Sequence, residues 1–476
     1  MTRGRRKLAL AAVLLVGLGG CASTPSSARL TAVQGLVTPR LGQPVQWLAG
    51  GPEDAAVAEA IHGLLSRPLT AEAAVQMALL SNRGLRAEYE ALGVAHADLL
   101  QAGLLDNPVL SAEFRFNGTT GITLDFVQNF LSLLTLPARR GIGARSFERA
   151  QLELAHKVLG VTGSVRATYY RLVADAQAIE LFRQVVEATE AAAELAERQV
   201  QAGTLSRREQ ALHQALYART VLELAEAETR FGVDREALNQ LLGLWGPQAT
   251  WQLPERLPEV PSAPPSFEGL EALAVTQRLD LAAARKHIEA AAGSLQLGRA
   301  TRFLSLLGLG LVAERDGEGT WQKGPRLELG VPFFDGGQAR VAGLEAEARR
   351  RAEVLAGLAI AIRSQVRETW QQLAAAQAAV AHYRAVLLPL NQEILEETQR
   401  LYNGMLVGVY DLLRSKQDQI STARDYIGAL RRYWVARAEL ERVLGGPLPA
   451  TASAAAVWRT AGRPVAVSAT EECQTC

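Results

Sequence analysis

Apolar residues recur every seven positions in two long segments of the chain, and the two segments match each other. The first line of apolar positions consists of Val165, Leu172, Ile179, Val186, Ala193 and Val200, and the second of Val366, Leu373, Val380, Leu387, Ile394 and Leu401. Each residue of the second line lies 201 positions after its counterpart. Both lines end close to a glycine, Gly203 or Gly404, and a second amphipathic segment follows. The pattern therefore predicts a tandem duplication of one helical unit.

The sevenfold lines predict long helices that pack against neighbouring helices as in a coiled coil. We expect a helix over residues 138–201 to form an antiparallel hairpin with one over 205–242, and a helix over 337–403 to pair with one over 409–444. At about 1.5 Å per residue, the longer helix of each pair would extend roughly 100 Å, which no compact domain contains. Pro389 lies inside the second of these helices and predicts a local kink.

Apolar and polar residues alternate with a period of two before each hairpin, which predicts two strands in each unit. The predicted strands cover residues 109–116, 122–130, 304–314 and 326–333. Runs of about ten residues suit strands that cross a bilayer at a tilt. The glycine-rich polar stretch 315–324 would join the second pair of strands, and a helix is expected before each pair, over residues 70–104 and 268–302.

The strand count predicts an assembly of several chains. About eight strands are the minimum for a membrane barrel, and open strand edges cannot lie in lipid, so four strands per chain must be pooled between chains. Three copies would give twelve strands, wide enough for a pore, although the count alone leaves other numbers open.

The N-terminus predicts export and a lipid anchor. Arg3, Arg5, Arg6 and Lys7 precede an apolar run over residues 8–18 that is too short to span a bilayer, which is typical of a signal peptide. The sequence Leu18-Gly19-Gly20-Cys21 resembles the bacterial lipobox, in which Cys21 would be lipidated and become the mature N-terminus. The same resemblance implies sorting to the outer membrane, because Ala22 rather than Asp follows. An ordinary signal peptide with a chance cysteine is the alternative.

These patterns divide the chain into six parts. They are a signal peptide (1–20), a lipid-anchored extension (21–66), the first repeat (67–246), a proline-rich linker (247–266), the second repeat (267–446) and a C-terminal tail (447–476).

Composition narrows the function classes. The chain has 50 basic and 49 acidic residues without a basic stripe, which argues against nucleic acid as a partner. No phosphate loop, nucleophile elbow or metal-binding helix motif occurs, so we expect neither catalysis nor a cofactor. No other run of the mature chain is expected to be a transmembrane helix. Two of the three cysteines, Cys473 and Cys476, end the chain; they could bind a soft metal ion, or form a disulfide or lie in a disordered tail.

Several further motifs show that the chain resembles the TolC-like outer-membrane efflux proteins over almost the whole mature sequence. They are Ala102-Gly103-Leu104-Leu105-Asp106-Asn107-Pro108, Val331-Pro332-Phe333-Phe334-Asp335-Gly336-Gly337, Leu401-Tyr402-Asn403-Gly404 and Val409-Tyr410-Asp411-Leu412-Leu413. The resemblance implies a homotrimer with a 12-stranded β-barrel in the outer membrane and an α-helical barrel in the periplasm. It also implies a periplasmic adaptor and an inner-membrane efflux transporter as partners, with small molecules or metal ions as cargo.

The resemblance places function at the hairpin tips. Asp411 matches the first acidic position of the family's periplasmic gate, next to Tyr410, whereas the second acidic position is Arg414 here. This difference predicts a contact between Asp411 and Arg414, within one chain or between chains; ordinary solvated charges are the alternative. The candidate adaptor contacts are Gly203, Thr204, Leu205, Gly404, Leu406, Val407 and Gly408. Plain helix caps would also explain these glycines.

Two other functions stay open at this point. A type I protein-secretion channel uses the same channel fold, and only the partner transporter distinguishes it from a drug or metal pump. A periplasmic coiled-coil scaffold would have no need for strands of bilayer length.

Overall fold

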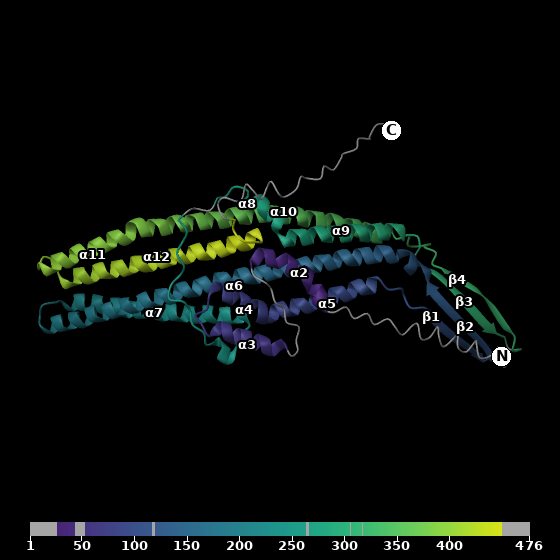
Figure 1. Ribbon diagram of the computed structural model, residues 1–476, viewed down its shortest axis with the longest axis horizontal. Helices are drawn as coiled ribbons and strands as arrows, with labels where there is room; N and C mark the ends of the chain where they lie inside the picture. Colours follow the sequence, from purple (N-terminus) through teal and green to yellow (C-terminus); the bar gives the residue numbers. More distant parts are fainter. Residues whose placement is uncertain are drawn as a thin grey trace, which may run out of the picture.

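The protein is an elongated molecule with a β-sheet at one end and the tips of two helical hairpins at the other (Figure 1). The computed structural model describes residues 26–42, 53–116, 120–262, 266–304, 306–316 and 318–449. Cys21, Cys473 and Cys476 lie outside the described residues. Within them, each half contains a strand pair and a long helical hairpin, so the predicted mainly helical fold with an internal duplication is confirmed.

The first hairpin consists of α6 (Phe130–Gln201), which has 72 residues, and α7 (Arg207–Leu242). Helix α6 begins eight residues before the predicted position 138. The Asn129 side chain caps it by accepting a hydrogen bond from the Ser132 amide at 3.3 Å. Pro137, the residue before the predicted start of the helix, lies inside it, about two turns after its first residue.

The second hairpin consists of α10 (Gln338–His382), a π-helical turn (Tyr383–Leu387), α11 (Leu388–Asn403) and α12 (Val409–Leu444). Where the sequence predicts a kink at Pro389, the helix contains this π turn, which ends at Leu387, two residues before the proline. A proline removes one backbone hydrogen bond and crowds the preceding turn, so a wider turn there relieves both effects.

The sheet contains four antiparallel strands in the order β1 (Val109–Phe116), β2 (Thr120–Asn129), β3 (Leu307–Arg315) and β4 (Trp321–Leu329). Strand β4 begins five residues before the predicted start at position 326. The linker between β3 and β4 is shorter than predicted because Asp316 organises a tight turn, with its carboxylate accepting hydrogen bonds from the amides of Glu318 (3.1 Å) and Thr320 (2.8 Å).

Each helix predicted before a strand pair is broken into two. The first consists of α4 (Ala71–Ser81) and α5 (Arg83–Ala102), and the second of α8 (Leu270–Gln277) and α9 (Leu279–Ala300). At the first break the side-chain amide of Asn82 donates to the carbonyl of Leu241 at 2.7 Å, and at the second the Arg278 guanidinium donates to the carbonyl of Val443 at 3.4 Å. The C-terminal end of one hairpin therefore contacts each break, α7 at Asn82 and α12 at Arg278.

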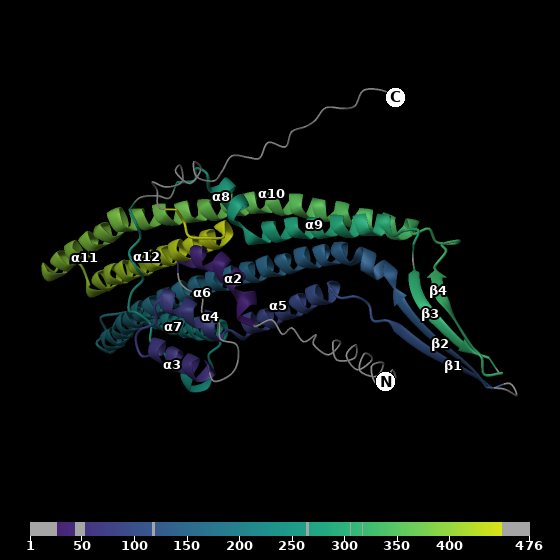
Figure 2. The ribbon, with the colours of Figure 1, turned by 45° about the vertical axis from the view of Figure 1, so that its right-hand side comes forward.

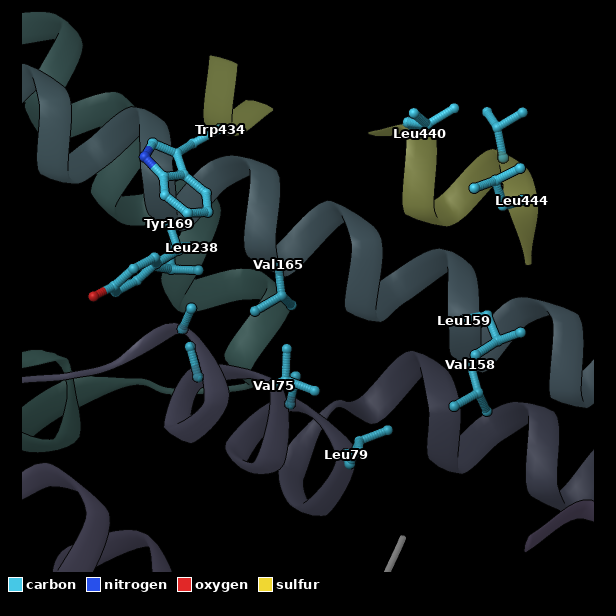
Figure 3. Close-up of a cluster of buried hydrophobic side chains, with 14 of the residues drawn as sticks. Val75, Leu79, Val158, Leu159, Val165, Tyr169, Leu238, Trp434, Leu440 and Leu444 are labelled. Atoms are coloured by element: carbon cyan, nitrogen blue, oxygen red, sulfur yellow. The ribbon is translucent and has the colours of Figure 1, made fainter. Parts of the chain in front are cut away.

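The main hydrophobic core lies midway along the molecule, where the two repeats meet. Figure 3 shows its centre, with side chains contributed by α4, α6, α7 and α12: Val75, Leu79, Val158, Leu159, Val165, Tyr169, Leu238, Trp434, Leu440 and Leu444. Two N-terminal helices, α2 (Ser26–Leu41) and α3 (Glu53–Leu65), lie beside this region (Figure 2). Helix α2 packs against α5 and α6 and buries Val33 and Val37 completely. The core in the middle of the molecule thus contains residues of both hairpins.

One helical run of the described residues, Gln338–Asn403, meets length and composition limits for a membrane span, with a mean hydropathy of 1.2 in its most apolar window. The prediction that no segment of the mature chain is long and apolar enough for a membrane span is therefore wrong by these two limits. The run packs against α8, α9 and α12, and 22% of that window is buried inside the chain.

Candidate functional site

The tip of the first hairpin is a compact turn built around Gly203. The Gly203 amide donates to the carbonyl of Val200 at 3.0 Å, and the Thr204 amide donates to the carbonyl of Gln199 at 2.9 Å. Gly203 has a φ of +74°, a left-handed conformation that glycine adopts at little cost. The tip residues Gly203 and Thr204 are exposed, and Leu205 is half-buried.

The tip of the second hairpin repeats this turn, but with Met405 in the place of Gly203. The Met405 amide donates to the carbonyl of Tyr402, and the Leu406 amide to that of Leu401, each at 2.9 Å. Met405 has a φ of +60°, whereas Gly404 has a φ of −81°. Gly404 therefore does not end its helix in the left-handed conformation that a plain glycine cap adopts.

The two tips correspond at a spacing of 202 residues, whereas the apolar lines match at 201. Near the core the spacing of 201 holds, since Val165 and Val366 are both fully buried, as are Leu172 and Leu373. The π turn lies between these positions and the second tip, and a π turn accommodates one residue more than an α-helical turn. We attribute the change of spacing to it, so Leu401 corresponds to Gln199 rather than to Val200.

Both tips are followed by a capped helix. In α7, Ser206 and Glu209 form a capping box, and hydrogen bonds from the Ser206 hydroxyl and amide lower the pKa of the Glu209 carboxylate. In α12, the Asp411 carboxylate accepts a hydrogen bond from the Gly408 amide at 3.0 Å. Asp411 thus caps α12 through a carboxylate at the positive end of the helix.

The structure places Asp411 and Arg414 on the same turn of α12 without an ion pair between them in the described part of the chain. A contact between the two residues of neighbouring chains stays a prediction.

Tyr410 connects the second hairpin to the first. Its hydroxyl donates to the side-chain carbonyl of Gln199 on α6 at 2.6 Å, and its ring stacks on His213 of α7 with 4.2 Å between ring centroids. Burial, with a smaller contribution from the Glu209 charge, raises the pKa of Tyr410, so its hydroxyl keeps its proton at neutral pH. The sequence indicated Tyr410 but neither partner, because a glutamine and a histidine on exposed helix faces carry no motif.

The second tip exposes the larger apolar surface of the two. Met405 is 93% exposed and Leu406 is 74% exposed, while Val407 is half-buried and Gly408 is exposed. Large exposed apolar side chains beside a turn are typical of surfaces that contact another protein. No group of three or more His, Cys, Asp or Glu residues that could hold a metal ion occurs in the described parts of the chain.

The chain was compared with known proteins in sequence and in structure. No protein-family model matches the chain. The chain is 24% identical over 384 residues to the cobalt-zinc-cadmium resistance protein CzcC of Cupriavidus metallidurans, across 79% of this chain and 90% of that protein. It superimposes on the CmeC outer membrane channel of Campylobacter jejuni with a TM-score of 0.66 at 14% identity, covering 88% of this chain and 92% of that one.

A membrane protein from Pseudomonas aeruginosa matches with a TM-score of 0.65 at 17% identity, over 79% of this chain and 93% of the other. The resemblance to outer-membrane channels of the TolC-like kind is therefore confirmed for the fold.

Proposed function

We propose that this chain, which has the fold of the TolC-like outer-membrane channels, forms the outer-membrane duct of a tripartite efflux pump. Three copies would join their sheets into a 12-stranded barrel in the outer membrane, and their hairpins would continue this barrel into the periplasm. The chain would export small molecules or metal ions passively, without a cofactor and without catalysis.

The observation that carries this proposal is the division of the sheet into an apolar and a polar face. The register places Leu110, Phe126, Leu311 and Pro325 side by side across the four strands, all on one face. On this face Leu110 is 75% exposed and Leu311 is 65% exposed. An apolar face of this size, on strands of eight to ten residues, is suited to lipid rather than to water.

The strand order supports assembly with sister chains. Strands β1 and β4 lie at the two edges of the sheet, so each has one side without a strand partner among the described residues of its own chain. Lipid cannot satisfy the backbone groups of an open edge, and pairing β1 with β4 of a neighbouring chain would satisfy them.

The remaining partners follow from the tips and the termini. We propose that a periplasmic adaptor contacts Gly203, Thr204, Leu205, Gly404, Leu406, Val407 and Gly408, and that lipid attached at Cys21 adds an anchor. An inner-membrane transporter would supply the cargo. The likeness to a protein named for cobalt, zinc and cadmium resistance supports metal ions as one cargo, with Cys473 and Cys476 as possible ligands.

Two measurements on the native host test the proposed function. The protein should fractionate with the outer membrane as an oligomer that dissociates only on heating in detergent. Deletion of its gene should increase the sensitivity of the cells to cobalt, zinc or cadmium salts or to drugs. Recovery of the mature chain as a stable monomer in detergent-free buffer would contradict the proposal.

The contact between Tyr410 and Gln199 predicts an effect on the resting channel. Tyr410→Phe keeps the ring that stacks on His213 but removes the hydrogen bond, which contributes about 1 kcal/mol. If this contact holds the two hairpins together at the closed end, the open fraction should rise about fivefold, as measured by single-channel recording in planar bilayers. Tyr402→Phe, at the same tip, is the control and should behave as the wild type. An unchanged open fraction in Tyr410→Phe would remove this contact from the gate.

A further inference from the structure

The polar face of the sheet carries six charged residues that the proposed function does not use. Strand register places Glu113, Arg115, Asp125, Glu314, Arg326 and Glu328 on the face opposite the apolar one. When a sheet of this kind closes into a membrane barrel, its apolar face meets lipid and its polar face lines the pore. The inner wall would therefore carry four carboxylates and two guanidinium groups per chain.

Arg326 and Asp125 form an ion pair that crosses a strand. Arg326 lies on β4 and Asp125 on β2, yet Arg326 Nη1 is 2.8 Å from Asp125 Oδ1. On β3, between them, Gly310 stands opposite Arg326 and has no side chain. Asp125 is only 9% exposed, which is unusual for a carboxylate on a sheet face that is open in the single chain.

Arg115, the other arginine of the polar face, pairs with exposed carboxylates rather than with a buried one. It lies 3.1 Å from Glu113 on its own strand and 3.5 Å from Glu314 on β3, but its side chain is 58% exposed and those of the two glutamates are at least half exposed. Exposed pairs of this kind are screened by water and salt. Because Asp125 is buried, its pair with Arg326 is screened less by water and salt than the pairs of Arg115.

We propose that the Asp125–Arg326 pair is a determinant of ion selectivity in the membrane part of the pore. The proposal rests on the proposed function, because it requires three chains around one pore. Each Arg326 offsets one carboxylate of a wall that is acidic overall, and three copies form a ring of such pairs at one level of the barrel. Cations are favoured by the acidic wall, and Arg326 limits that preference.

The test is the ratio of potassium to chloride permeability, obtained from reversal potentials of the purified oligomer in planar bilayers under a potassium chloride gradient. Arg326→Gln should raise the ratio about twofold or more, because it exposes the Asp125 charge. Arg326→Lys should leave it near the wild-type value, and Asp125→Asn should lower it. Lys323→Gln is the matched control: it removes a positive charge from β4 on the apolar face and should leave the ratio unchanged.

The possible outcomes separate the two proposals. Absence of any channel from properly folded wild-type protein would overturn the proposed function itself. Wild-type channels whose permeability ratio is the same in Arg326→Gln would overturn the selectivity role alone, as would an equal change in Lys323→Gln. If Asp125→Asn yields no heat-sensitive oligomer, the proposal is tested with Arg326→Gln and Arg326→Glu instead. Arg326→Glu should then raise the permeability ratio further than Arg326→Gln.

Discussion

Replacement of Gly310 by alanine is expected to abolish the oligomer that resists detergent before heating, and with it export. Gly310 lies on β3, where a Cβ atom would stand 2.1 Å from the carbonyl oxygen of Phe126 and 3.1 Å from Cα of Val127. Both atoms belong to the backbone of β2, so no side-chain rotation can remove the contact. The pairing of β2 with β3 joins the strand pairs of the two repeats, and forcing them apart would disrupt the sheet at its centre.

The expected cost is about 3 kcal/mol or more per chain, at the upper end of that for added atoms in a packed site. It can be measured as the amount of heat-sensitive oligomer in outer-membrane fractions of cells that express equal amounts of each variant. Gly324→Ala is the matched control, because Gly324 lies on β4 in the same sheet and a Cβ atom there would meet nothing within 4 Å. Normal assembly of Gly310→Ala would show that β2 and β3 do not approach each other as closely as described.

The features that the sequence predicted well are those with a regular period. The strands follow from alternation, because only a period of two places Leu110 and Ala112 on one face and Ser111 and Glu113 on the other. The hairpins follow from the sevenfold lines, because Val165, Leu172 and their counterparts are buried between helices.

The breaks at Asn82 and Arg278 were missed for a physical reason. Apolar positions continue in a helical pattern through both, and neither residue forbids a helix. Each break is stabilised by a hydrogen bond to a residue far away in sequence, 159 positions for Asn82 and 165 for Arg278. Local periodicity contains no information about such contacts.

The candidate site at the hairpin tips could be predicted only in part from the sequence, for a related reason. A single added residue in the second hairpin changes the spacing from 201 to 202, and motif matching aligned the two glycines instead. The hydrogen bonds of the turns show that Gly404 corresponds to Ala202 and Met405 to Gly203. The position of a turn in a long hairpin is therefore set by backbone geometry as well as by its glycine.

The second large effect is expected at Arg278, which is 7% exposed and holds the second break together. Its guanidinium contacts Asp280 through two hydrogen bonds, at 2.5 Å and 3.0 Å, and also binds Gln365 at 2.9 Å and the carbonyl of Val443. Arg278→Ala leaves the Asp280 carboxylate, itself 19% exposed, without its cation. Breaking a buried pair in this way costs about 3–5 kcal/mol, so the midpoint of thermal unfolding, followed by circular dichroism, should fall by several degrees.

The control is Arg367→Ala, since Arg367 pairs with Glu271 at 3.6 Å but its side chain is 58% exposed. An exposed pair contributes about 0–1 kcal/mol, so this variant should unfold close to the wild-type temperature. Equal losses in the two variants would show that Arg278 acts only through general packing.

The pH dependence of the Arg278→Ala defect tests its electrostatic origin. Burial raises the pKa of Asp280, but the hydrogen bonds and charge of Arg278 outweigh burial, so the pKa of Asp280 in the folded wild type is lowered. The wild type therefore keeps this stabilisation above the unfolded pKa of about 3.9 and loses it only as the pH falls through the lower, folded value. In Arg278→Ala, the Leu281 amide still donates to the carboxylate at 2.9 Å, but the largest contributions that oppose burial are gone. We therefore expect the pKa of Asp280 to rise, so the variant is destabilised at neutral pH and this loss is relieved once Asp280 binds a proton. The difference in unfolding temperature between wild type and variant should therefore shrink from pH 7 toward pH 4, and a constant difference would rule out an uncompensated Asp280 charge as its cause.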